Sequence, residues 1–322
     1  MSSPSNSGSV LEVRDLRVYF RVKGSKNYLK AVDGVSVSVE RAKSLGIVGE
    51  SGSGKTTLGK AALKLVRPRS GAVLFEGRDV YRLRGREERE FRKKVQMVFQ
   101  DPFDATDPLY SVYDTVAEGI RILHLAHTRR ELDERVHSAL ESVALTPPEA
   151  FVHRRITSLS GGQRQRVAIA RVLAMDPEAI ILDEPVSMLD ASVRGEIMSI
   201  MNNLKSRGKT FMMITHDIAT LKFFADDVTV MYLGKIMEQA PVADIVKNPL
   251  HPYTQALIAA VPVPDPNHKV KSLAKGEIPS PLNPPSGCPF HPRCPIAQSV
   301  CAEVEPELRS VGPRRLVACH FA

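Results

Sequence analysis

Residues Gly49 to Thr56 have the types and spacing needed to bind the phosphate groups of a nucleotide. Glycines in such a loop let backbone N–H groups converge on phosphate oxygens, the Lys55 ammonium can reach the terminal phosphates, and the Thr56 hydroxyl can ligate Mg²⁺. The residues expected to contact nucleotide or metal here are Gly49, Ser51, Gly52, Ser53, Gly54, Lys55, Thr56 and Thr57. A flexible turn is the alternative interpretation of the same pattern.

The elements on either side of this loop favour phosphate binding. The apolar run Leu45–Val48 predicts a buried strand before the loop, and apolar residues at helical spacing predict a helix over Lys55–Leu65 after it. A helix that begins at the loop points its N-terminus at the bound anion. The context is therefore the one that a phosphate-binding loop requires.

Two carboxylates follow the apolar run Ala179–Leu182, which predicts a second buried strand. Asp183 would hold Mg²⁺ through water. Glu184, just beyond the strand, would polarise the attacking water and accept its proton. The alternative is a strand end that carries two solvated carboxylates.

A second anion site is predicted at Ser160, Gly162 and Gln163, immediately before a helix expected over Arg164–Ala174. Serine and glycine at a helix N-terminus leave backbone N–H groups available to an anion. An ordinary N-cap would use the same residue types, so the segment is informative only together with the phosphate loop.

These features, together with His216 after the apolar run Phe211–Thr215, resemble the ATP-binding cassette (ABC) family and occur in that family's order. The resemblance covers nearly the whole chain. It implies that ATP and Mg²⁺ are bound and that ATP is hydrolysed. It also implies a head-to-tail dimer, in which the signature segment at Ser160 closes on ATP held by the phosphate loop of the other subunit.

The resemblance implies roles for further residues. Gln100 matches the glutamine that senses magnesium and water and couples to the membrane subunit. His216 matches the histidine that contacts the γ-phosphate, and Asp190 matches the aspartate of the loop that joins the two subunits. Phe20 occupies the place of the aromatic residue that stacks on adenine, with neighbouring Tyr19 as the substitute. Because no reacting group is missing, we expect hydrolysis and not a subunit whose nucleotide only holds a dimer.

Within the family, the chain is most similar to the ATPases of oligopeptide and dipeptide importers. The resemblance rests on the insertion Arg21–Lys30, the Gln100-Asp-Pro turn, and the tail segments Asn248–Leu257, Gly276–Pro281 and Cys288–Pro295. It implies a second ABC ATPase subunit, a paralogue or a copy of this chain, with two membrane permease subunits and an extracellular solute-binding protein. It also implies a peripheral position on the cytoplasmic face of the cell membrane. The same subfamily serves oligosaccharides and nickel, so these substrates stay open.

All four cysteines, Cys288, Cys294, Cys301 and Cys319, fall in the C-terminal segment, with five, six and seventeen residues between them. Four thiolates are the usual complement for a 4Fe-4S cluster, and related importer ATPases can carry one here. Zn²⁺ usually takes closer pairs, although His291 and His320 keep it as an alternative. Two disulfides are a third possibility, disfavoured in a reducing cytoplasm.

Composition limits the classes of function. Apolar residues make up 43% and charged residues 25% of the chain, and no uncharged apolar run approaches the roughly 18 residues that span a bilayer. The net charge of +8 is spread along the chain, so we expect no nucleic-acid partner. An ABC ATPase that acts on DNA or ribosomes is the rival class, but the chain has neither a long coiled-coil insertion nor a second cassette.

The predicted fold is α/β, with a RecA-like P-loop core, an antiparallel β subdomain, an inserted helical lobe and a Pro/Cys-rich C-terminal extension. We expect a disordered tail over residues 1–9, an ABC ATPase domain over residues 10–245 and the extension over residues 246–322. The helical lobe is expected at about residues 102–175, where long amphipathic stretches occur. Dense proline after residue 246 makes long regular elements unfavourable there.

Overall fold

The computed structural model describes residues 8–22, 24, 27–101, 106–261 and 274–322, and the chain forms two compact units. The first unit combines Met1–Glu40, Ser44–Tyr81 and Met213–Ala322, and the second combines Arg41–Lys43 and Arg82–Met212. The predicted N-terminal tail falls largely on residues 1–7, outside the described residues. The predicted domain boundaries stay predictions.

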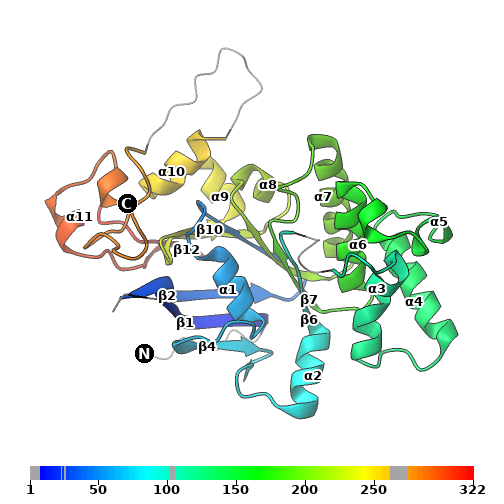
Figure 1. Ribbon diagram of the computed structural model, residues 1–322. Coiled ribbons are helices and arrows are strands. Elements are labelled where there is room, and N and C mark those ends of the chain that lie inside the picture. Colours follow the sequence, from blue (N-terminus) through cyan, green and yellow to red (C-terminus); the bar gives the residue numbers. More distant parts are fainter. Residues whose placement is uncertain (1–7, 23, 25–26, 102–105, 262–273) are drawn as a thin grey trace. The chain divides into compact units, whose positions relative to one another are not determined.

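An antiparallel four-stranded sheet opens the first unit (Figure 1). Its order is β2-β1-β4-β5, with strands β1 (Ser9–Arg21), β2 (Tyr28–Glu40), β4 (Ser70–Phe75) and β5 (Arg78–Asp79). Buried and exposed residues alternate along β2. Val35, Val37 and Val39 lie on the buried face of the sheet, and the residues between them are exposed. This period of two confirms the strand predicted from the sequence.

The phosphate loop follows strand β3 (Ser44–Val48) of the second sheet. This strand is wholly buried and runs parallel to β9 (Asp227–Tyr232). Antiparallel pairing continues through β10 (Lys235–Pro241) and β12 (Arg315–Val317) to β11 (Arg309–Gly312). Helix α1 (Lys55–Ala62) follows the loop, so the predicted order of strand, loop and helix is confirmed.

Helix α1 is shorter than predicted. We expected it to reach Leu65, but it ends at Ala62. Lys64 adopts a left-handed φ of 62°, and the Leu65 N–H bonds to the Lys60 carbonyl at 2.9 Å, which closes the helix. Leu65 is therefore 49% exposed and does not belong to the buried face that its spacing suggested.

Short elements make up the C-terminal part of the first unit, as the dense proline predicts. The helices are α8 (Ile218–Lys222), α9 (Val242–Lys247), α10 (Pro252–Ala259) and α11 (Ser299–Glu303), with a 3-10 turn η2 (His291–Arg293). Pro252 begins α10, where a missing N–H costs nothing, and His251 caps that helix by accepting the Tyr253 N–H on Nδ1 at 3.0 Å.

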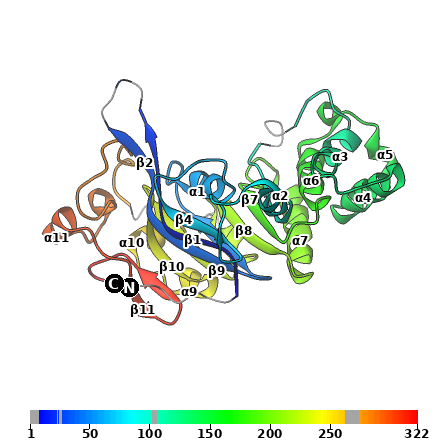
Figure 2. The same ribbon diagram turned by 90° about the horizontal axis from the view of Figure 1, so that it is seen from below.

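The second unit is mostly helical (Figures 1 and 2). Its helices are α2 (Gly85–Lys94), α3 (Val112–Ile122), α4 (Arg129–Ser142), α5 (Glu149–Val152), η1 (Ile156–Ser158), α6 (Gly161–Leu173) and α7 (Ala191–Ser206). Helix α6 packs against α3 and α4. The strands β6 (Val95–Val98) and β7 (Ala179–Asp183) pair in parallel, and β8 (Thr210–Thr215) carries the chain back into the first unit.

Within the residues that the structure describes, no helix is both long enough and apolar enough to cross a bilayer.

Candidate functional site

The phosphate loop sits on the carboxyl end of β3 and on the N-terminus of α1. Gly54 is the N-cap of α1 at φ 99°, and Gly52 has φ 78°. Ser51 and Gly52 are exposed, Thr56 and Thr57 are half-buried, and Ser53 and Lys55 are buried. The loop therefore presents backbone and hydroxyl groups outward while its lysine lies beneath them.

Two glycines of the loop are required by close backbone contacts. A Cβ at Gly49 would lie 2.1 Å from the Met231 carbonyl oxygen, and one at Gly54 would lie 2.0 Å from the Ala31 carbonyl oxygen. Real Cβ atoms essentially never approach this closely. The loop thus takes its shape from backbone neighbours on β9 and β2.

The Lys55 ammonium is folded over the loop. It donates to the carbonyl oxygens of Gly49 at 2.7 Å and Glu50 at 2.9 Å, and to the Ser53 hydroxyl at 3.3 Å. A positive charge is therefore held at the centre of the loop, where phosphate oxygens would meet it.

Residues of the C-terminal extension, which the sequence patterns did not indicate, hold the loop. The Glu50 N–H donates to the Tyr253 hydroxyl at 2.8 Å, and Arg293 donates to both Glu50 carboxylate oxygens, at 2.6 and 2.9 Å. The only sequence signal was an arginine between two cysteines in an otherwise proline-rich segment, since a buried guanidinium needs a charged partner.

The second unit holds the predicted acidic pair. Asp183 is the last residue of β7 and is 2% exposed. Glu184 follows it with a φ of 50° and is also buried. A left-handed glutamate is an unfavourable backbone conformation, of the kind that clusters at functional sites. Both carboxylates lie at the strand end where the sequence placed them.

Ser160 and Gln163 form a capping box at the start of α6. The Gln163 N–H donates to the Ser160 hydroxyl at 3.3 Å, and the Ser160 N–H donates to Gln163 Oε1 at 3.1 Å. The helix begins at Gly161, three residues earlier than predicted, because this box starts it. A Cβ on Gly162 would lie 2.5 Å from Val193 Cγ1, so glycine lets α6 and α7 approach closely.

Asp190 caps α7 in the same way. Its carboxylate accepts the Val193 N–H at 3.0 Å and the Ser192 hydroxyl at 2.7 Å. The Val193 N–H and then the Ser192 hydroxyl lower the pKa of the Asp190 carboxyl, which keeps it charged at neutral pH.

The remaining predicted residues are surface groups. Gln100 follows β6 in the second unit and His216 follows β8 in the first, and both are exposed. Phe20 is 39% exposed. Tyr19 is otherwise engaged, because its hydroxyl donates to Asp33 and Arg69 lies over its ring at 5.4 Å. Phe20 is therefore the freer of the two rings.

All four cysteines line one small cavity in the first unit, and all four are free thiols. Gly287 makes this possible, since a Cβ there would lie 2.3 Å from the Cys301 carbonyl oxygen. The Cys288 N–H donates to that oxygen at 2.8 Å, which ties the two buried cysteines together. The described residues contain no group of three His, Cys, Asp or Glu side chains close enough to hold a single metal ion.

Burial controls protonation around this cavity. It is the main reason that the pKa of the Cys288 thiol is raised to about 11, and the other three cysteines contribute to that rise. Burial also lowers the pKa of His251, which lines the same cavity, to about 4. The Cys288 thiol and the His251 imidazole are therefore neutral at pH 7, and a bound cation would have to displace the Cys288 proton.

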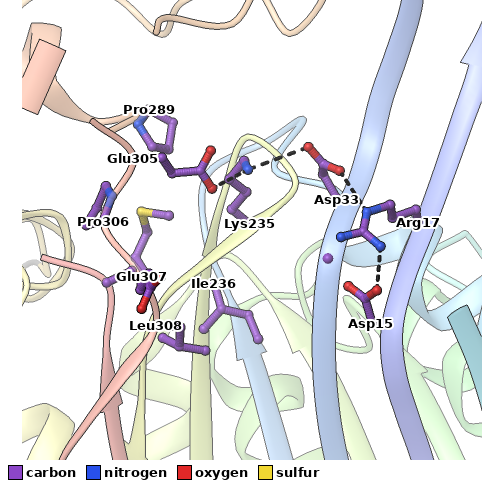
Figure 3. Close-up of a pocket in the computed structure, with 13 residues that line it drawn as sticks. Asp15, Arg17, Asp33, Lys235, Ile236, Pro289, Glu305, Pro306, Glu307 and Leu308 are labelled. Atoms are coloured by element: carbon purple, nitrogen blue, oxygen red, sulfur yellow. Dashed lines mark hydrogen bonds and ion pairs between the residues drawn. The ribbon is translucent and has the colours of Figure 1, made fainter. Parts of the chain in front are cut away.

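A second hollow, of about 490 Å³, lies in the first unit (Figure 3). Lys235 stands between Asp33 at 3.5 Å and Glu305, and Arg17 pairs with Asp15 and Asp33. These lining charges are committed to one another, so the hollow offers a ligand few unpaired groups.

Two family models match the chain. The model described as "ABC transporter" matches residues 32–187. The model described as "Oligopeptide/dipeptide transporter, C-terminal region" matches residues 237–301.

Relatives match along nearly the whole length. The oligopeptide transport ATP-binding protein AppF of Bacillus subtilis is 43% identical and covers 98% of each chain. The oligopeptide transport ATP-binding protein OppF of Salmonella typhimurium is 41% identical, over 96% of this chain and 95% of its own.

Solved structures match over most of the chain. The dimeric ATP-binding cassette MJ0796, in a post-hydrolysis state with ADP and Pi, superposes with a TM-score of 0.65 at 27% identity. The superposition covers 72% of this chain and 98% of the MJ0796 chain. CbiO1 from Clostridium perfringens, part of an ABC transporter complex, has a TM-score of 0.64 at 29% identity, over 75% and 92%.

Proposed function

Because this chain belongs to the ABC transporter family of ATP-binding proteins, we propose that it is the ATP-hydrolysing subunit of an importer of di- and oligopeptides. The family resemblance and the α/β fold predicted from the sequence are confirmed. Peptide as the substrate is supported by the names of the relatives and by the match of the C-terminal region.

The observation that carries this proposal is the phosphate loop itself. Lys55 is the first residue of α1, and its ammonium lies on two loop carbonyls, 2.7 and 2.9 Å away. Binding of ATP would exchange these carbonyls for the β- and γ-phosphate oxygens, while the loop N–H groups and the helix N-terminus add further donors. Thr56, next along α1, would supply its hydroxyl to Mg²⁺.

The acidic pair would carry the hydrolytic step. Asp183 would hold Mg²⁺ through water, and the Glu184 carboxylate would orient the attacking water and take its proton. Burial of both side chains supports these roles, since packed side chains hold their position better than exposed ones. His216 would contact the γ-phosphate, Gln100 would sense metal and water, and Phe20 would stack on adenine.

A second subunit would complete each site. Ser160, Gly162 and Gln163 begin α6, and their capping box leaves the first N–H groups of that helix oriented toward an incoming anion. We propose that this N-terminus closes on ATP held by the phosphate loop of a second ABC ATPase, with Asp190 at the joint. The dimeric state described for the cassette MJ0796 supports this arrangement.

The other partners follow from the importer assignment. Two membrane permease subunits would receive the ATPase pair at the cytoplasmic face of the membrane, and an extracellular solute-binding protein would deliver the peptide. The second ATPase would be either a copy of this chain or a paralogue.

We also propose that the four cysteines hold a 4Fe-4S cluster. Four free thiols around one cavity, with apolar Phe290 and Ile296 beside them, fit a cofactor that takes one thiolate on each of four irons. ATP hydrolysis needs no electron carrier, so we assign the cluster a structural role. It would cross-link the C-terminal extension through its four cysteine ligands. Iron and sulfide analysis after anaerobic purification tests this. About four iron atoms per chain would support the cluster. A colourless, iron-free protein, with or without zinc, would reject it.

Purification of the native membrane complex, with mass spectrometry of its subunits, tests the importer proposal. We expect two permeases and a second ATPase, and a peptide ligand on the associated binding protein. A binding protein that takes an oligosaccharide or nickel would correct the substrate. Recovery with DNA or ribosomes would overturn the importer function.

A further inference from the structure

Glu50 is the point at which the C-terminal extension contacts the phosphate loop. Its N–H is fixed by the Tyr253 hydroxyl and its carboxylate by both terminal nitrogens of Arg293. Arg293 is only 8% exposed and the Glu50 side chain is 27% exposed, so the pair is largely shielded from competing water on the arginine side. These contacts join residues more than two hundred positions apart in the sequence.

The other side of Glu50 faces the reacting centre. Its carbonyl oxygen accepts the Lys55 ammonium at 2.9 Å and the Ser53 N–H at 3.2 Å. A rotation of the peptide at Glu50 would therefore move the lysine and the N–H groups that meet the phosphates. Such groups lose much of their effect when displaced by about 1 Å.

Arg293 is itself held rigidly. Its guanidinium lies 5.8 Å from the ring centres of both Tyr232 and Phe290, and it donates to the Tyr232 hydroxyl at 3.3 Å. Tyr232, Tyr253 and Phe290 pack together, with ring centres 4.7 to 5.5 Å apart, and all three are buried. These contacts fix the position of the guanidinium, so Arg293 can also fix the position of the Glu50 carboxylate that it binds.

The segment that carries Arg293 also lines the cysteine cavity. Arg293 ends the 3-10 turn η2, and Cys294 follows it directly. Phe290 lines the cavity beside Cys288 while it also packs on the aromatic rings under Glu50. The segment that presents two thiols to the cavity therefore presents Arg293 to the phosphate loop.

We propose that Arg293 is a positioning residue for nucleotide phosphates, acting through Glu50, so that the cysteine-bearing extension sets the geometry of the phosphate loop. The inference rests on the proposed ATP site. The side-chain hydrogen bonds of Arg293 go to Glu50 and Tyr232. Arg293 holds the peptide from which Lys55 and the loop N–H groups take their positions.

A double-mutant cycle on the full-length protein tests this. The affinity for a fluorescent ATP analogue with Mg²⁺, the kcat and KM of ATP hydrolysis, and the melting temperature are measured for Glu50→Gln, Arg293→Met and the double variant. We expect each single variant to weaken nucleotide affinity on the order of tenfold and the double variant to be no worse than either. Arg293→Lys, which keeps the cation but not the paired donors, should lie between Arg293→Met and the wild type.

Arg315 provides the matched control. It is an extension arginine with a 13% exposed side chain, paired at 2.9 Å with the buried Glu238, and it makes no hydrogen bond or ion pair with the described residues of the phosphate loop. Arg315→Met should lower the melting temperature without changing nucleotide affinity or KM. A merely structural role for Arg293 predicts that the two arginine variants behave alike.

The outcomes separate the two proposals. Additive effects in the cycle, or an Arg293→Met affinity within twofold of the wild type, overturn the positioning role. Failure of the wild-type protein itself to bind the nucleotide would instead reject the proposed ATP site.

Discussion

The side chains of Ser160 and Gln163 each cap the other's backbone N–H, at 3.3 and 3.1 Å, so the two polar residues expected at a shared ATP site also start helix α6. A capping box usually contributes only stability. A second function for the same residues would show as an effect on hydrolysis larger than the effect on folding.

Ser160→Ala should separate these two roles. Loss of the cap should cost about 1 kcal/mol of unfolding free energy. Nucleotide binding to the isolated subunit should be unchanged because the phosphate loop is intact, while ATP turnover should fall at least tenfold. Thr128→Ala is the control, since Thr128 caps α4 by accepting the Glu131 N–H at 3.2 Å. Equal turnover in the two variants would contradict a role for Ser160 beyond the cap.

Glu184→Gln should retain ATP binding and lose hydrolysis. The amide keeps the size of the side chain but cannot accept the proton of the attacking water, so turnover should fall by about a hundredfold or more. Size-exclusion chromatography with ATP should show a stable dimer. Glu178→Gln, immediately before the first residue of β7, should hydrolyse ATP normally. Wild-type turnover in Glu184→Gln would reject the assigned base.

Lys55→Ala should weaken nucleotide binding itself. A charged hydrogen bond to phosphate is lost, so the dissociation constant for MgATP should rise by about ten- to a hundredfold. Calorimetric titration measures this directly. Lys60→Ala, in the last turn of the same helix, should bind as the wild type does. Unchanged affinity in Lys55→Ala would count against the phosphate loop.

Asp33 should make stability depend on pH. Burial alone would raise the pKa of its carboxyl, but the Tyr19 hydroxyl and the Lys235 and Lys30 ammonium groups lower it below its usual value. A lowered pKa in the folded state gives stability that is present above the unfolded pKa of about 4 and is lost as the pH falls below it. Asp33→Asn should therefore be less stable than the wild type at pH 7, by at most about 1 kcal/mol because solvent screens the pairs.

Thermal unfolding at several pH values measures this difference, which should shrink as the pH falls below the unfolded pKa of about 4 and vanish once the carboxyl is protonated in both states. Asp176→Asn is the comparison, since Asp176 pairs with Lys209 but is 80% exposed. A constant difference between Asp33→Asn and the wild type across this range would contradict the ion-pair explanation.

Local patterns in the sequence predicted the strands, the phosphate loop and the helices that follow the functional segments, because burial and helix capping depend on neighbouring residues. The end of α1 was predicted wrongly, since nothing in the local spacing requires the left-handed turn at Lys64. The contact of Arg293 with Glu50 was not predictable either. It depends on a glycine at residue 287, on packed aromatic rings and on the register of the extension, which only the folded chain brings together.

ATP-driven uptake by vesicles that contain the purified membrane complex tests the central claim most directly. With peptide-loaded binding protein outside and ATP inside, labelled peptide should accumulate in proportion to ATP hydrolysed, and a complex carrying Glu184→Gln should do neither. Hydrolysis without peptide uptake, or uptake that continues with Glu184→Gln in every copy of this subunit, would contradict the assignment of this chain as the ATP-hydrolysing subunit of a peptide importer.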